Sequence, residues 1–141
     1  MQQQIALMTL GVADMAASRR FYCDGFGWKA AFEHDGIAFF QMNGFIFGLW
    51  DKAQLAEDVQ RADLPAPGAC ALAHNLASRD EVEPLMDRLR AHGGSLVREA
   101  GDPAYPGYRG YVADPDGHLW EIGWNPAWPI DREGHVRIPV T

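Results

Sequence analysis

One carboxylate near the C-terminal end of the chain stands among apolar residues, where a charged group could do chemistry. Residues 114–121 read Asp-Pro-Asp-Gly-His-Leu-Trp-Glu, and the first four are typical of a β-turn because Pro fixes φ and Gly tolerates a positive one. Alternation along the following strand predicts Leu119, Glu121 and Gly123 on one face. A carboxylate there is costly unless it is paired, hydrated or bound to a metal. Glu121 is therefore the first candidate for a metal ligand or a general base, and a hydrogen-bonded carboxylate without chemistry is the equal alternative.

The histidines offer less. His74 lies in an apolar run, and alternation places it on the face opposite Ala71, Ala73 and Asn75. A core or interface histidine is the favoured interpretation, because only a shift in strand register would bring its side chain to Glu121. The sequence shows no Ser/His/Asp or Cys/His arrangement and no Gly-rich phosphate loop.

Aromatic residues accompany the candidate carboxylate. Tyr108 and Tyr111 precede the turn, and Trp50 ends an apolar run whose predicted inward face lies opposite Glu121. Aromatic walls with one carboxylate and a few polar groups describe a pocket for a small, largely apolar ligand. An ordinary sheet core with tyrosines at its rim is the alternative. The predicted ligand-binding residues are Trp50, Asn75, Tyr108, Tyr111 and Glu121.

The first half of the chain must supply the elements that position such a pocket. A helix is expected after Asp14, whose side chain suits an N-cap. Asn43-Gly44 between apolar runs is a strong hairpin signal. The predicted strands cover residues 5–12, 28–32, 37–42 and 45–50, followed by a short helix over residues 51–59.

The second half repeats this order. Ser78 and Glu81 form a capping-box pattern, and we expect the helix to begin near Asp80, so that Pro84 falls in its first turn. The predicted strands cover residues 69–76, 95–98, 108–113 and 118–124. A single α+β domain of two βαβββ modules explains this repeat. Its parts are residues 1–60, a linker at 61–68, residues 69–125 and a tail at 126–141.

Three stretches also resemble a known family. Residues 12–22 (Val-Ala-Asp-Met-Ala-Ala-Ser-Arg-Arg-Phe-Tyr), residues 25–28 (Gly-Phe-Gly-Trp) and residues 114–121 resemble the vicinal oxygen chelate superfamily, which includes glyoxalase I, the bleomycin-resistance proteins and extradiol dioxygenases. The resemblance spans about residues 5–125 and implies paired βαβββ modules whose curled mixed sheets enclose a cavity.

The same resemblance implies where a metal would bind. In the metal-dependent members, the ligands come from the first and last strands of the modules, which correspond here to Leu7, Gly48, Ala71 and Glu121. Only Glu121 has a donor atom in its side chain, whereas a catalytic metal usually has three protein ligands. We therefore expect no metal and no other cofactor.

Composition limits the partners. Lys and Arg number 12 against 19 Asp and Glu, so the net charge is −7 at pH 7. Nucleic acids and anionic membranes require clustered positive charge, and no apolar run approaches the roughly 20 residues of a membrane span, so neither partner is expected. Cys23 and Cys70 are predicted to be small buried residues in a reducing, cytoplasmic environment. Open sheet faces and an apolar tail, with Trp128 and Val140 among its residues, predict a homodimer.

Two functions remain. The missing donor atoms favour a metal-free protein that binds a small aromatic or cationic molecule, as the resemblance to bleomycin-resistance proteins implies. The alternative is a glyoxalase-like lyase, isomerase or dioxygenase acting on a small oxygenated substrate, with Glu121 as metal ligand or general base. A general base would need a pKa raised by burial.

Overall fold

The computed structural model describes residues 1–139, so Val140 of the predicted apolar tail lies outside the described residues. The first module contains β1 (Leu7–Val12), α1 (Met15–Arg19), the π-helical segment η1 (Arg20–Gly25), β2 (Phe32–His34), β3 (Ile37–Gln41), β4 (Ile46–Asp51) and α2 (Lys52–Asp58). The second contains β5 (Ala71–Asn75), the 3-10 turn η2 (Arg79–Glu81), α3 (Val82–Ala91), β6 (Ser95–Gly101), β7 (Tyr108–Ala113) and β8 (Leu119–Trp124).

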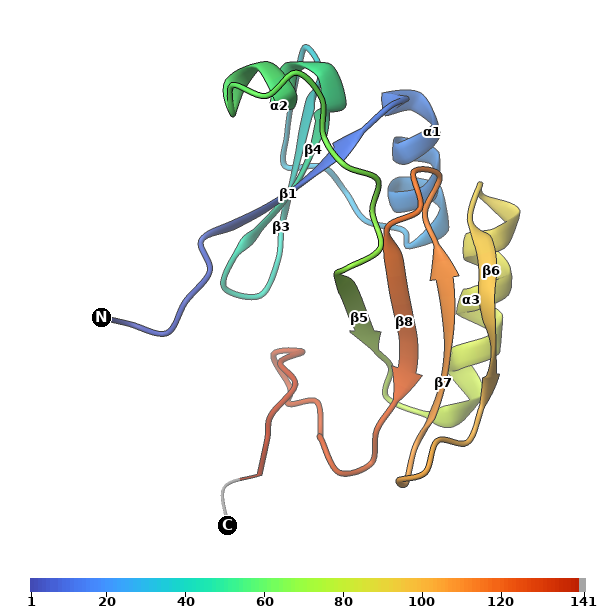
Figure 1. The fold of residues 1–141 in the computed structure, drawn as a ribbon. Helices are drawn as coiled ribbons and strands as arrows, with labels where there is room; N and C mark the ends of the chain where they lie inside the picture. Colours follow the sequence, from blue (N-terminus) through green and yellow to red (C-terminus); the bar gives the residue numbers. More distant parts are fainter. Residues whose placement is uncertain (140–141) are drawn as a thin grey trace.

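The two modules share one sheet topology. The strand orders are β1-β4-β3-β2 and β5-β8-β7-β6. In each sheet the first pair is parallel and the other pairs are antiparallel. The α+β class with tandem βαβββ modules is therefore confirmed. The two sheets remain separate and are not closed into one barrel (Figure 1).

Local signals in the sequence account for the helix starts. The Asp14 side chain accepts a hydrogen bond from the Ala17 amide and caps α1. Ser78 and Glu81 form the predicted capping box, and α3 begins at Val82, so Pro84 lies in the first turn, where its missing N–H does no harm.

Two expectations about local structure are wrong. The strand predicted at residues 28–32 begins only at Phe32. The Trp28 amide instead donates to the Tyr22 carbonyl, and the Trp28 ring stacks on Phe26 with centroids 4.4 Å apart, because the aromatic core takes this side chain out of the sheet. Cys70 is exposed rather than buried, since it precedes β5 instead of lying inside it.

The core lies between the modules. Phe21 and Tyr22 of η1 are fully buried, together with Phe47 of β4 and Ile122 of β8. The Tyr22 ring lies 5.2 Å from that of Phe47 and 6.0 Å from that of Trp120, so one side chain contacts both sheets. One face of each sheet is thereby buried in a core that the two modules share.

A buried carboxylate joins the modules at this point. Asp114, which is 2% exposed, accepts a hydrogen bond from the Tyr22 hydroxyl at 2.7 Å and two more from the amides of Asp116 and His118. The Trp120 indole donates to the same Tyr22 oxygen at 3.1 Å. Burial raises the pKa of Asp114, and the hydrogen bond from Tyr22 works against that rise. The Asp-Pro-Asp-Gly turn is therefore an anchor between modules as well as a turn.

The tail runs along the body. Ile130 and Val136 form an isolated antiparallel bridge, and the Asn43 amide donates to the Gly134 carbonyl at 3.1 Å, which ties the tail to the β3–β4 hairpin. Among residues 1–139, no helix has the length and apolar composition needed to cross a bilayer.

The first prediction concerns the anchor. Tyr22→Phe removes the hydroxyl from a buried carboxylate and leaves the Trp120 indole without its acceptor. We expect a loss of about 2–3 kcal/mol in the free energy of unfolding, measured by urea denaturation. Tyr105→Phe, which changes a half-exposed tyrosine in the same way, should stay within about 0.5 kcal/mol. Equal effects of the two variants would contradict the assigned role.

The cost of Tyr22→Phe should also depend on pH. Because the folded pKa of Asp114 is raised, its contribution to stability is complete below the unfolded pKa and falls as the pH rises through the folded one. Tyr22 limits that fall by stabilising the charged form. The difference between wild type and variant should therefore grow from about pH 3 to about pH 7. A difference that shrinks over this range would contradict the assignment.

Candidate functional site

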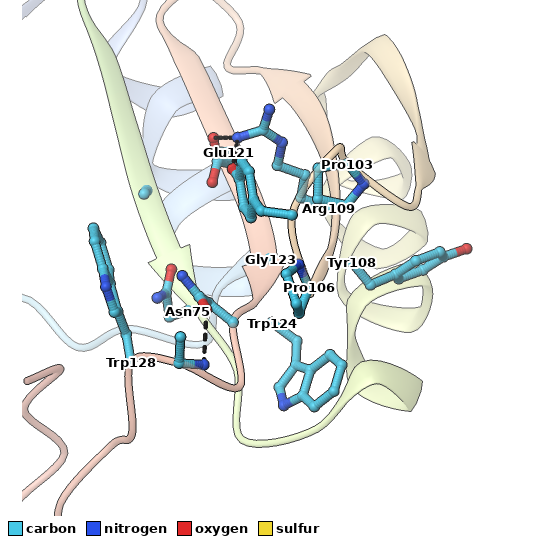
Figure 2. Close-up of a pocket in the computed structure, with 13 residues that line it drawn as sticks. Asn75, Pro103, Pro106, Tyr108, Arg109, Glu121, Gly123, Trp124 and Trp128 are labelled. Carbon is cyan, nitrogen blue, oxygen red and sulfur yellow. Dashed lines mark hydrogen bonds and ion pairs between the residues drawn. The ribbon is translucent and has the colours of Figure 1, made fainter. Parts of the chain in front are cut away.

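A cavity of about 570 Å³ lies on the face of the second sheet that points away from α3. The sheet contributes Ala73 and Asn75 from β5, Arg109 from β7 and Glu121 from β8, and Trp128 of the tail forms a side wall (Figure 2). Strand register explains this grouping, because Glu121 is paired with Ala73 on one side and with Tyr111 on the other.

Glu121 is held by two donors from its own sheet. Its Oε2 accepts hydrogen bonds from the Tyr111 hydroxyl at 2.5 Å and from Arg109 Nη1 at 3.3 Å. The Arg109 and Glu121 side chains are each about one-quarter exposed, so solvent screens this ion pair only in part. The hydrogen bond to Glu121 raises the pKa of Tyr111, which keeps the phenol protonated as a donor. Glu121 is therefore a hydrogen-bonded carboxylate in this structure, which is one of the two alternatives that the sequence left open.

Arg109 is held by Tyr105 as well as by Glu121. Its Nη1 also contacts the Tyr105 hydroxyl, and its guanidinium lies over the Tyr105 ring, 5.1 Å from the centroid. Its Nε is buried and has no hydrogen-bond partner among residues 1–139. Buried donors are nearly always satisfied in folded proteins, so this Nε–H is an unsatisfied donor enclosed among its neighbours and does not face the cavity.

Not all of the predicted site residues meet. Asn75, Tyr111 and Glu121 share one face of the second sheet. Tyr108 is among the residues that border the cavity, but its side chain points away from Glu121, as Figure 2 shows, and its hydroxyl donates to Glu83 of α3. Trp50 belongs to the first sheet, where its indole donates to Gln54 at 3.0 Å, so it does not reach Glu121 within one chain.

Sequence reasoning did not assign Arg109 and Trp128 to the site. In β7, Arg109 shares a face with Tyr111, whereas Tyr108 lies on the opposite face. Alternation along β7 therefore predicts that the Arg109 side chain lies beside Tyr111 and that the Tyr108 side chain does not. Trp128 lies in a tail without strand or helix periodicity, and no pattern indicated where its ring would lie.

The donor set does not fit a metal at Glu121. Ala73 is the β5 residue beside it, and the corresponding pair in the first sheet is Thr9 with Gly48. The β1 and β5 positions beside Gly48 and Glu121 are therefore Thr9 and Ala73, each two residues after the predicted Leu7 and Ala71 and on the same face of its strand. His74 pairs with Ile122 on the opposite face. One carboxylate already paired with a guanidinium lacks the ligands that a catalytic metal requires.

Comparisons with known proteins agree with this architecture. The family model described as Glyoxalase/Bleomycin resistance protein/Dioxygenase superfamily matches residues 4–122. The chain belongs to this superfamily. It is 52% identical to a glyoxalase-related enzyme from Fulvimarina pelagi, with a TM-score of 0.95 over 99% of this chain and 100% of that one.

More distant structures of the superfamily share the fold. A lactoylglutathione lyase from Agrobacterium tumefaciens is 22% identical, with a TM-score of 0.69 over 90% of this chain and 97% of that one. A genomically encoded fosfomycin resistance protein from Listeria monocytogenes is 20% identical, with a TM-score of 0.69 over 89% and 95%. At this identity the likeness establishes the fold alone.

The donor set predicts the response to metals. We expect purified protein to hold no stoichiometric divalent ion, and we expect Zn²⁺, Ni²⁺, Mn²⁺ and Fe²⁺ not to raise its melting temperature, because Glu121 is the single carboxylate on this face of β5 and β8. Elemental analysis and thermal denaturation test both statements. Glu121→Gln is the control, because it keeps the shape and removes the charge. A bound ion present in wild type and lost in Glu121→Gln would overturn the prediction.

Proposed function

We propose that this protein binds a small, largely apolar molecule in the metal-free cavity around Glu121. The observation that carries the proposal is the internal pairing of Glu121 with Arg109 and Tyr111, beside a cavity with aromatic and proline walls. Such a cavity provides apolar contact area and a few oriented polar groups, which is what a small-molecule site requires.

The polar groups favour an aromatic ligand over a cationic one. Arg109 compensates the charge of Glu121, so a second cation gains less from the carboxylate. Both donors to Glu121 use Oε2, so Oε1 suits a donor atom on the ligand. Trp128 and Tyr105 supply aromatic surface on either side.

The alternative is a glyoxalase-like lyase, isomerase or dioxygenase acting on a small oxygenated substrate. The 52% identity to a protein described as a glyoxalase-related enzyme favours it. Glu121 would then act as metal ligand or general base. A base would have to use Oε1, because Oε2 already accepts from two donors.

A homodimer would complete the molecule. The open face of the first sheet exposes Leu7 and Ile46, which are paired in neighbouring strands, and Phe32 is 52% exposed at β2. Covering such a face with a second copy removes apolar surface from water. Since Trp50 and Glu121 lie on different sheets of one chain, a second copy is also the way in which they can share a cavity.

The state of the two cysteines is relevant to the cellular compartment of the protein. Cys23 is half-buried and Cys70 is exposed, and neither forms a disulfide. Because unpaired cysteines persist in reducing environments, we place the protein in the cytoplasm.

A ligand screen tests the proposed site. A small-molecule library scored by the rise in melting temperature should give hits enriched in aromatic compounds, because a ligand at 100 times its dissociation constant stabilises by about 2.7 kcal/mol. Glu121→Gln and Tyr111→Phe should reduce that rise, and Tyr108→Phe, the matched control, should retain it. Equal loss in Tyr108→Phe and Tyr111→Phe would contradict the site. Metal-dependent conversion of a hit, detected by mass spectrometry, would favour the enzyme.

Sedimentation tests the dimer. At micromolar concentration we expect twice the mass of one chain. Phe32→Glu should shift the species toward monomer, because it places a charge on the open face of the first sheet. Val97→Glu is the matched control, since Val97 is 51% exposed on the second module. A wild-type protein that sediments as a monomer would contradict the proposal.

A further inference from the structure

A second cavity, of about 660 Å³, lies between the modules on the other side of β5. Its walls include Trp28, Phe47 and Trp120, with Leu72 and His74 of β5. Leu72 and His74 point toward the shared core, while Ala73 and Asn75 lie on the Glu121 face and border both cavities, so the two cavities are neighbours at β5.

The walls of this inter-module cavity are aromatic and fixed. The Trp28 ring lies 5.8 Å from Phe47 and 5.6 Å from Trp120, in both cases edge to face. Trp120 is held through its indole by Tyr22, so it is not free to collapse into the space. This packed aromatic cluster gives the cavity an apolar wall, which suits a planar, apolar ligand body.

The imidazole of His74 adds one polar group to the wall. Its ring lies 5.4 Å from Phe26, edge to face. Burial lowers the pKa of His74, so the ring is neutral near pH 7 and can donate one hydrogen bond and accept another.

The mouth of the cavity has a positive character. Lys29 and Arg137 border it, and none of the residues within 1–139 that line it is Asp or Glu, in a chain whose net charge is −7. Arg137 also forms an ion pair with Asp131, at 3.0 Å. Lys29 is exposed, and no carboxylate of the described residues lies within ion-pair distance of it.

The tail closes the same mouth. Gly134–Arg137 border the cavity, and the hydrogen bond from Asn43 to Gly134 holds them beside the β3–β4 hairpin. The apolar residue Val136 also borders the cavity, and Arg137 adds its charge at the entrance. A segment outside both modules is thus fixed where it completes a hollow.

We propose that the inter-module cavity is a second ligand site, which takes a planar aromatic anion with its rings against Trp28 and Trp120 and its charge at Lys29 and Arg137. The site does not depend on Glu121, so it stands whether or not the proposed function is correct. The charge preference also differs, because the Glu121 cavity holds a paired carboxylate and the inter-module cavity holds none.

A pair of probes with the same rings tests the charge preference. 8-Anilinonaphthalene-1-sulfonate is an aromatic anion, and N-phenyl-1-naphthylamine is its neutral counterpart. We expect Lys29→Met to weaken binding of the anion about five-fold, as for a partly exposed ion pair, and to leave the neutral probe unchanged. Lys52→Met, the matched control at the other lysine of the chain, should change neither. Equal effects of Lys29→Met and Lys52→Met on the anion would overturn the proposed charge preference.

Two further variants locate the bound anion. Met8→Trp places a larger side chain in the cavity wall, and it should abolish binding of the anion without lowering the melting temperature. Trp28→Phe should remove more of the tryptophan-to-probe energy transfer than Trp128→Phe, which changes the Glu121 cavity. Binding that survives Met8→Trp, or that is lost in Glu121→Gln instead, would overturn the proposed site.

Discussion

The hydroxyl of Tyr22 is the contact on which the arrangement of the molecule depends. It donates to Asp114 and accepts from Trp120, which lie 92 and 98 residues further along the chain. The turn that carries Asp114 makes further bonds to the first module, since Asp116 accepts from the Ala13 amide and His118 Nε2 lies 3.1 Å from the Gly11 carbonyl oxygen. A slip of one module against the other would break all of these bonds together, so the relative position of the two sheets is fixed by polar geometry, and the apolar core fills the space between them.

Fixing the modules in this way decides where ligands can bind. Each sheet has one face in the shared core, and its opposite face is left open. Glu121 follows Trp120 in β8, so the same strand supplies an anchor to the core and a carboxylate to the cavity. Because side chains alternate between the two faces of a strand, placing Trp120 in the core puts Glu121 on the opposite face, where the cavity lies. The open face of the first sheet results from the same constraint, and there the apolar residues Leu7 and Phe32 remain exposed.

Much of this could be predicted because the signals are local. The caps at Asp14 and Ser78 and the position of Pro84 depend on neighbouring residues alone, and the face of Glu121 follows from alternation in one strand. Trp28 could not be placed, because its departure from the sheet depends on Phe26 and Trp120, which meet only in the folded core. Tyr108 was assigned to the pocket for its residue type, although it lies three residues from Tyr111 in β7, a separation that puts two side chains on opposite faces.

The two carboxylates of the second module show how similar groups come to serve different purposes. Asp114 is buried with hydroxyl and amide donors and without a cation, and its raised pKa reflects the cost of keeping a charge there. Glu121 lies seven positions later at the edge of a cavity, where Arg109 supplies the opposite charge and solvent reaches both side chains. The Asp114 carboxyl is costly to ionise, and the contacts that it makes between the modules compensate that cost. The Glu121 carboxylate keeps its charge satisfied by its own sheet, so the bonding capacity left for a ligand lies with the second oxygen of Glu121. A cavity that presents one acceptor, already neutralised by a guanidinium, between aromatic walls selects ligands by shape and hydrogen bonding more than by net charge.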